Sequence, residues 1–153
     1  MMENPSSSAD DKVASDIRKF GWHSLHVFSN EADELPFSYS IGFTQTYAAP
    51  EVLIFNVERT KAHKLLWACA HVLKDGGMLT PDAKDDRILN NDYQVIFKTL
   101  RVSAYGEYLG TARRYYGSKP FPAVVMFLPD REDRYPWEAG YDYIDVAEAL
   151  SIV

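Results

Sequence analysis

Residues 36–57 read PFSYSIGFTQTYAAPEVLIFNV, and this stretch decides the fold class. From position 37 to 43, large apolar side chains alternate with small ones, which is the period-two pattern of a half-buried β-strand. Residues 52–55 are apolar on both faces and predict a strand that is buried on both sides. Between them, residues 44–50 form a polar connector, where side chains can reach a ligand from a rigid base.

The pattern on either side of this stretch predicts further helices and strands. Apolar residues at helical spacing predict a helix over residues 10–20, which Gly21 ends, and a strand follows over residues 22–28. The clearest helix follows residue 60, where the apolar positions make one stripe that ends at Gly76 and Gly77. These positions are Ala62, Leu65, Leu66, Cys69, Val72 and Leu73. Later segments predict a long strand or strand pair over 93–105 with a bulge or bend near residues 98–99, a short helix over 107–116, a strand over 121–128 and a closing helix over 145–150.

This order of elements predicts one α+β domain. Strands that follow one another in sequence, with about three helices between them, favour a mostly antiparallel sheet, and curling into a barrel is one form that such a sheet takes. We expect a flexible tail at residues 1–9 and a single globular domain over residues 10–153, because no linker or repeat divides the chain.

The composition and charge of the chain argue against several classes of function and location. The chain has 153 residues, 46% of them apolar, and a net charge of -6, which argues against non-specific nucleic-acid binding. Cys69 is the only cysteine, so no intramolecular disulfide forms, which agrees with a reducing compartment. The polar, acidic start does not resemble a signal peptide, and no apolar run is long enough to span a membrane. We therefore expect a cytoplasmic protein.

The motifs of metal and nucleophilic chemistry are missing from the sequence. His23, His26, His63 and His71 do not have the spacing of zinc ligands, so we expect no stoichiometric zinc. Cys69 lies on the apolar stripe of a helix, where a thiol is usually inert packing. The glycine-rich loop of dinucleotide sites and the serine motif of hydrolases are both absent.

Two clusters remain as candidate sites. The segment Arg113, Arg114, Tyr115, Tyr116 sets guanidinium groups beside aromatic rings, a combination that suits a phosphate or carboxylate next to a flat heterocycle, although a solvated helix face has the same composition. Residues 130–137, DREDRYPW, place Trp137 in a charged loop. That segment either lines a pocket or seats a partner, or its Trp folds back to close the core.

The chain also resembles a known family. The segments GWHSLHVF, PFSYSIGFTQTYAAPEVLIFNV, AHKLLWACAHVLKDGG, LGTARRYYG and FPAVVMFLPDREDRYPW occur in this order. Over about residues 17–138 the chain is similar to the uncharacterised bacterial family of the domain of unknown function numbered four-two-six-two. The resemblance implies a small stand-alone bacterial domain and no particular activity.

Our leading hypothesis is a module that binds a small anionic or aromatic ligand, or a protein partner, without catalysis of its own. The candidate ligand-binding residues are Tyr39, Thr44, Arg113, Arg114 and Trp137, provided that the connector and the end of the 107–116 helix meet at one end of the sheet. No cofactor is predicted. One alternative is a flavin- or nucleotide-using enzyme on a split-barrel-like scaffold. Another is an immunity-type protein whose acidic surface meets a basic partner.

Overall fold

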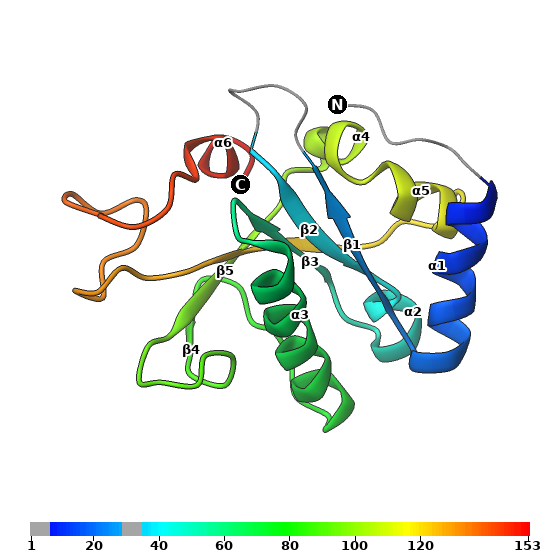
Figure 1. The fold of residues 1–153 in the computed structure, drawn as a ribbon, viewed down its shortest axis with the longest axis horizontal. Coiled ribbons are helices and arrows are strands. Elements are labelled where there is room, and N and C mark those ends of the chain that lie inside the picture. Colours follow the sequence, from blue (N-terminus) through cyan, green and yellow to red (C-terminus); the bar gives the residue numbers. More distant parts are fainter. Residues whose placement is uncertain (1–6, 29–34) are drawn as a thin grey trace.

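The computed structural model describes residues 7–28 and 35–153, and its centre is a six-stranded sheet in the order β1-β2-β3-β6-β5-β4 (Figure 1). The strands are β1 (His23–Val27), β2 (Phe37–Ile41), β3 (Glu51–Phe55), β4 (Lys84–Asp85), β5 (Val95–Thr99) and β6 (Ala123–Phe127). The helices are α1 (Ser7–Phe20), α2 (Phe43–Tyr47), α3 (Arg59–Lys74), α4 (Tyr105–Tyr108), α5 (Gly110–Tyr116) and α6 (Ala147–Leu150), with a 3-10 turn at Val102–Ala104.

The sheet is mixed and open. All neighbouring strands pair antiparallel except β3 and β6, which run parallel. The expected α+β class with a mostly antiparallel sheet is confirmed, whereas the expectation of a barrel is wrong. In the described part of the chain β1 and β4 end the sheet and do not pair with each other. The sheet stays open because helices cover both of its faces, so curling is not needed to bury them.

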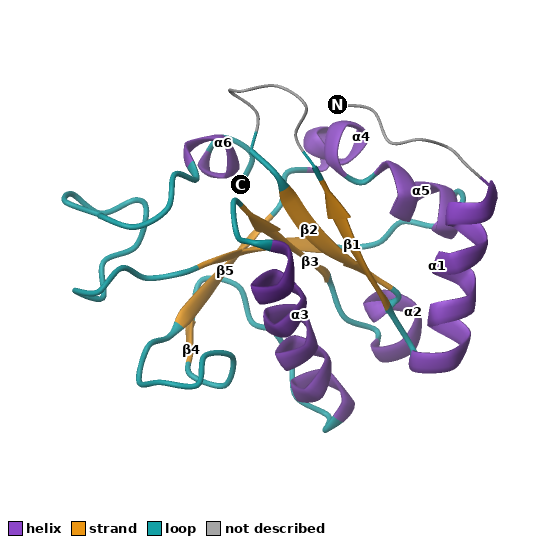
Figure 2. Ribbon diagram, in the orientation of Figure 1, coloured by secondary structure: helices purple, strands orange, loops and turns teal. Residues whose placement is uncertain are grey.

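Helices lie on both sides of the sheet, as Figure 2 shows in purple against the orange strands. One core forms between the sheet and α3 and includes Val52, Ile54, Leu66 and Met126. On the opposite face, α1, α4, α5 and α6 contribute to a second core around Tyr39 and the other side of the same strands. The central strands β2, β3 and β6 are accordingly buried along their whole length. The prediction for β3 is confirmed, but β2 is buried on both faces rather than half-buried.

Several element boundaries differ from the sequence-based expectation. Helix α1 begins at Ser7, inside the expected tail, and residues 1–6 of that tail lie outside the described residues. The connector between β2 and β3 forms α2 instead of a loop. The expected long strand is wrong beyond Thr99, because there the chain turns through a 3-10 turn into α4. The described residues thus hold six α-helices, of which α1, α3 and α5 match the three main helices expected and α6 matches the expected closing helix.

The start of β3 carries a fully buried carboxylate that joins distant segments. Glu51 accepts hydrogen bonds from five donors of β2, of α2 with the turn residue before it, and of α5. These are Ser40 Oγ at 2.8 Å, the backbone N–H groups of Gly42, Phe43 and Thr44 at 3.1 Å each, and Tyr116 Oη at 2.5 Å. Burial raises the pKa of the Glu51 carboxyl, and the hydrogen bonds from Tyr116, Thr44, Ser40 and Gly42 oppose that rise.

Gly42 makes this arrangement sterically feasible. Its φ is 117°, a backbone conformation that residues with a side chain rarely adopt. A Cβ at this position would also lie 2.7 Å from the Gly21 carbonyl oxygen. The turn therefore aims three successive N–H groups at Glu51 while passing close to the chain between α1 and β1. A short helix that begins at such a nest of N–H groups binds an anion, and here the anion is the chain's own side chain.

We predict that Glu51→Gln destabilises the fold. The amide is the same size, but its NH₂ group must face donors instead of accepting from them, and leaving buried donors unsatisfied costs about 1–3 kcal/mol each. We expect the free energy of unfolding, measured by urea titration, to fall by at least about 3 kcal/mol. The matched control is Glu107→Gln, which changes an exposed carboxylate. A loss no larger than in this control would contradict the role given to Glu51.

We also predict that the thiol of Cys69 is unreactive in the native protein. Cys69 is fully buried on the apolar stripe of α3, as expected, and burial raises the pKa of its thiol far above neutrality. A thiol reagent at neutral pH should label the protein at the rate of global opening and rapidly only in denaturant. Fast stoichiometric labelling without denaturant would show that this part of the core opens locally.

Candidate functional site

The crevice at the carboxyl ends of β3 and β6 has the topology of a ligand site. The two strands are parallel neighbours, but the chain leaves them toward opposite faces of the sheet. After β3 it enters α3, which packs on one face, and after β6 it runs through residues 128–146 to α6, which packs on the other. In open α/β sheets ligands bind outside the strand ends at such a switch point.

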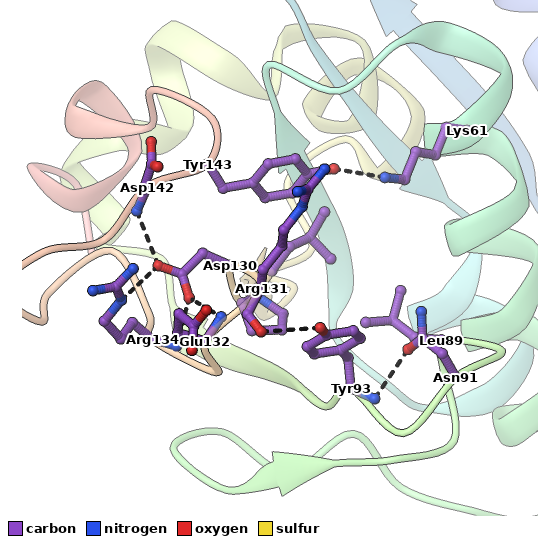
Figure 3. A pocket seen from close by; sticks show the side chains of 12 residues that line it. Lys61, Leu89, Asn91, Tyr93, Asp130, Arg131, Glu132, Arg134, Asp142 and Tyr143 are labelled. Atoms are coloured by element: carbon purple, nitrogen blue, oxygen red, sulfur yellow. Dashed lines mark hydrogen bonds and ion pairs between the residues drawn. The ribbon is translucent and has the colours of Figure 1, made fainter.

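A pocket of about 600 Å³ lies in this crevice, and Figure 3 shows it from close by. Its walls come from the first turn of α3, from the segment that leads into β5 and from the segments around residues 130 and 142. The lining residues are Lys61, Leu89, Asn91, Tyr93, Leu128, Pro129, Asp130, Arg131, Glu132, Arg134, Asp142 and Tyr143. This volume is within the range of pockets that hold small organic ligands.

One buried carboxylate shapes the loop beside the pocket. Asp130 Oδ1 accepts from the N–H groups of Glu132 and Arg134, and its Oδ2 accepts from Arg134 Nε and the Asp142 N–H, all at 2.9 Å. Burial by itself would raise the pKa of Asp130, but these hydrogen bonds outweigh it and lower the pKa to about 2. The carboxylate is therefore ionised at neutral pH and ties the 130–134 turn to residue 142.

Tyrosine hydroxyls fasten the same loop to the rest of the fold. Tyr93 Oη donates to the Arg131 carbonyl at 3.0 Å, Tyr135 Oη to the Gln94 carbonyl at 2.9 Å, and Tyr141 Oη to the Leu128 carbonyl at 3.0 Å. Each bond joins the loop to the chain before β5 or to the end of β6. Hydrogen bonds within the protein thus hold the pocket wall in place.

The groups that a ligand would meet are mixed in character. In Figure 3, Asp130, Glu132, Arg134 and Asp142 gather in the Asp130 network, while Lys61 lies across the pocket beside Tyr143. Lys61 Nζ donates to Tyr143 Oη at 2.7 Å, and the ammonium also lies 5.4 Å from the ring centre. Arg131 is exposed and lines the pocket as well. Lys61 and Arg131 are therefore the cations that the Asp130 network does not use.

The sequence-predicted residues are distributed over both ends of the sheet. Tyr39 is fully buried in the core, and Thr44 Oγ1 donates to the Ala49 carbonyl at 2.6 Å. Arg114 pairs with Asp10 of α1 at 3.2 Å. Arg113 is exposed on α5.

The structure brings the connector and α5 together. Tyr115 Oη donates to Gln45 Oε1 at 2.7 Å, and Tyr116 binds Glu51 beneath α2, so the ends of the sheet near Thr44 and the two arginines coincide. Trp137 lies elsewhere: it packs against Phe127 at the opposite end of β6, with ring centres 5.5 Å apart. The five residues therefore do not converge on one pocket, and their part in ligand binding stays a prediction.

Sequence reasoning missed Lys61, Tyr93 and Tyr143, but it identified the segment that forms one wall. Asp130, Arg131, Glu132 and Arg134 of the DREDRYPW stretch line the pocket, while Trp137 stacks on Tyr135 with ring centres 5.4 Å apart. The available signal was position: residue 128 follows directly after the buried strand β6, and Lys61 lies in the first turn of the helix that follows the buried strand β3. This signal would suffice only if the two strands were known to be parallel neighbours.

Within residues 7–28 and 35–153, no group of three or more His, Cys, Asp or Glu side chains is placed to hold a metal ion. None of the helices in the same ranges is both long and apolar enough to cross a bilayer.

Comparison with known proteins gives one match. A family model described as a domain of unknown function (DUF4262) matches residues 16–142, which agrees with the resemblance seen in the sequence. No curated protein and no solved structure matches the chain.

We predict that Asp130→Asn loosens the pocket wall and changes the pH dependence of stability. The pKa of Asp130 is lower in the folded state than its ordinary value of 3.8, so its charge stabilises the fold above about pH 4, and this contribution is lost as the pH falls toward 2. The stability difference between wild type and variant should therefore be largest near pH 7 and shrink below pH 4, as measured by urea titration at each pH. Asp92→Asn, an exposed carboxylate, is the control, and a difference that does not change with pH would contradict this account.

Proposed function

Because the chain belongs to the DUF4262 family, whose description assigns no activity, we propose a function from the geometry of the crevice. The protein binds a small ligand that carries a carboxylate or phosphate next to a flat apolar group. One observation carries the proposal: Lys61 and Arg131, which come from different elements, line one preformed pocket together with the rings of Tyr93 and Tyr143.

Charge supports the anionic part of the ligand. The ammonium of Lys61 already donates to a tyrosine hydroxyl, and a ligand anion is a stronger acceptor than that hydroxyl. Arg131 presents a planar fork that suits two oxygens of a carboxylate or phosphate. Arg134 contributes less to anion binding, because its Nε already donates to Asp130.

Shape and stiffness support the flat apolar part. Leu89, Leu128 and Pro129 supply apolar surface in the pocket, and the Tyr93 and Tyr143 rings offer faces for stacking. The wall is held by Asp130 and by tyrosine hydroxyls, so little ordering has to accompany binding. Preorganisation of this kind raises affinity by reducing the entropic cost of association.

The proposal is for binding without catalysis, and it differs from the two alternatives that the sequence left open. The alternative of a flavin- or nucleotide-using enzyme assumed a split-barrel scaffold, and the open sheet with helices on both faces does not agree with that scaffold. An immunity-type protein that meets a basic partner remains a second hypothesis, which rests on the net charge of -6 alone.

The test uses phenyl phosphate as a probe, with inorganic phosphate and phenol as its two halves. We expect phenyl phosphate to bind more tightly than either half in isothermal titration calorimetry. Loss of one charge-assisted hydrogen bond costs about 1.5–3 kcal/mol, so Arg131→Ala and Lys61→Ala should each weaken binding roughly ten- to hundredfold. Native mass spectrometry of the freshly purified protein checks for a copurified anion.

The comparison variant is Arg113→Ala, which removes an exposed guanidinium of the cluster predicted from sequence. Under the proposal it leaves the affinity unchanged. A loss in Arg113→Ala with none in Arg131→Ala would move the site to the α2–α5 end of the sheet. Failure of all three probes to bind, together with the absence of any copurified small molecule, would contradict the proposed function.

A further inference from the structure

A second hollow, separate from the crevice, follows the edge strand β1. We call it the β1 groove; its volume is about 570 Å³. It is lined by Lys12, Asp16 and Phe20 of α1, by Trp22, His23, Ser24 and His26 of β1 and its approach, by Ser38 of β2, and by Arg59, Thr60, His63 and Trp67 of α3. Because α1 and α3 pack on opposite faces of the sheet, they form the two walls, and β1 lies between them (Figure 1).

The floor of the groove is an unpaired strand edge. Among the described residues β1 pairs only with β2, and no backbone hydrogen bond joins its other side to a further segment. An edge strand presents alternating N–H and C=O groups that another extended chain can pair with. The five residues of β1 span roughly 17 Å, enough for a short peptide strand.

Large aromatic side chains are exposed around this edge. Phe20 is 63% exposed where α1 ends, Phe28 is 57% exposed where β1 ends, and Trp67 is 49% exposed on the α3 wall. Trp67 stacks on the buried Trp22 with ring centres 5.8 Å apart, so its position is fixed by the core. Phe20 and Trp67 line the groove, and Phe28 lies just outside its lining, beside His26 with ring centres 4.6 Å apart. Exposed aromatic residues that gather in one place are typical of a binding surface.

The charge of the groove is opposite to that of the whole chain. Its lining includes two basic residues, Lys12 and Arg59, but a single acidic residue, Asp16, in a protein with a net charge of -6. Asp16 is committed, because it accepts from Lys12 at 2.8 Å and bonds His23 Nδ1 at 2.7 Å. No ion pair engages Arg59 within the described part of the chain, so its charge is available at the α3 wall.

We propose that the β1 groove docks an extended, acidic segment of a partner protein, which pairs with β1 as an added strand. An acidic side chain of the segment meets Arg59, and a large apolar side chain packs against Phe28 or Trp67. In such strand addition the backbone supplies affinity, and the alternate side chains supply specificity. A second copy of the chain fits less well, because a twofold interface would set the same cationic groove against itself.

The experiment starts from the full-length protein and a phage library of random linear 12-residue peptides. We expect enriched sequences that combine Asp or Glu with a large apolar residue. The best peptide is then synthesised, and its affinity should fall at least tenfold for Arg59→Glu and for Trp67→Ser. Lys119→Glu, the same charge change at an exposed loop position, should leave the affinity unchanged.

Strand pairing has its own readout. N-methylation of alternate peptide residues removes the N–H groups of one side of the strand, so one of the two alternating sets should abolish binding and the other should not. No enrichment over the empty support, enriched peptides without acidic residues, or equal binding of both methylated sets would overturn the proposal. A dimer in sedimentation velocity that Trp67→Ser dissociates would also overturn it, because a second copy would then occupy the groove.

Discussion

The buried carboxylate of Glu51 is the interaction on which the arrangement of the fold depends. Taking an ionised carboxylate out of water is costly unless donors replace its hydration. Here five donors from three elements do so, and each donor is placed by a different feature: Ser40 by the register of β2, three N–H groups by the turn at Gly42, and Tyr116 by the end of α5. The connection between β2 and β3 is thereby bound to a helix that lies some 65 residues further along the chain.

A second buried carboxylate has the same role at the opposite end of the parallel strands. Glu51 closes the amino end of β3, where α2 and α5 meet, and Asp130 organises the loop just beyond the carboxyl end of β6. The two carboxylates differ in their donors. Glu51 accepts hydrogen bonds from the N–H groups at the start of α2. Asp130 instead shapes a loop that lines a pocket. The Glu51 end of the sheet is filled by the protein's own side chains, whereas the Asp130 end carries the pocket for which ligand binding is proposed.

Local patterns in the sequence account for much of the fold. Period-two alternation placed β2, the doubly apolar run placed β3, and the apolar stripe placed α3 with Cys69 inside it. The patterns failed where polar residues are buried: Ser38 and Ser40 made β2 look half-exposed, yet each hydroxyl is hydrogen-bonded, to His26 and to Glu51. They also failed at the connector. The five-residue α2 has no helical repeat of apolar residues, and the hydrogen bonds from its first N–H groups to Glu51 stabilise it instead. Of the candidate site, one pocket wall was predictable from the unusual DREDRYPW segment, but Lys61 and Tyr143 carry no local signature.

By itself the sequence determined the fold class, the position of most strands and helices, the burial of the single cysteine and the family, because each of these depends on patterns among residues that are close in sequence. Tertiary structure alone decided that β6 inserts between β3 and β5. That insertion makes β3 and β6 parallel neighbours and brings Lys61 and Arg131 into the lining of one pocket. It also leaves β1 as a free edge between α1 and α3. Strand order is a choice among long-range pairings whose backbone hydrogen bonds are nearly equivalent, so packing of both sheet faces, and not local periodicity, selects it.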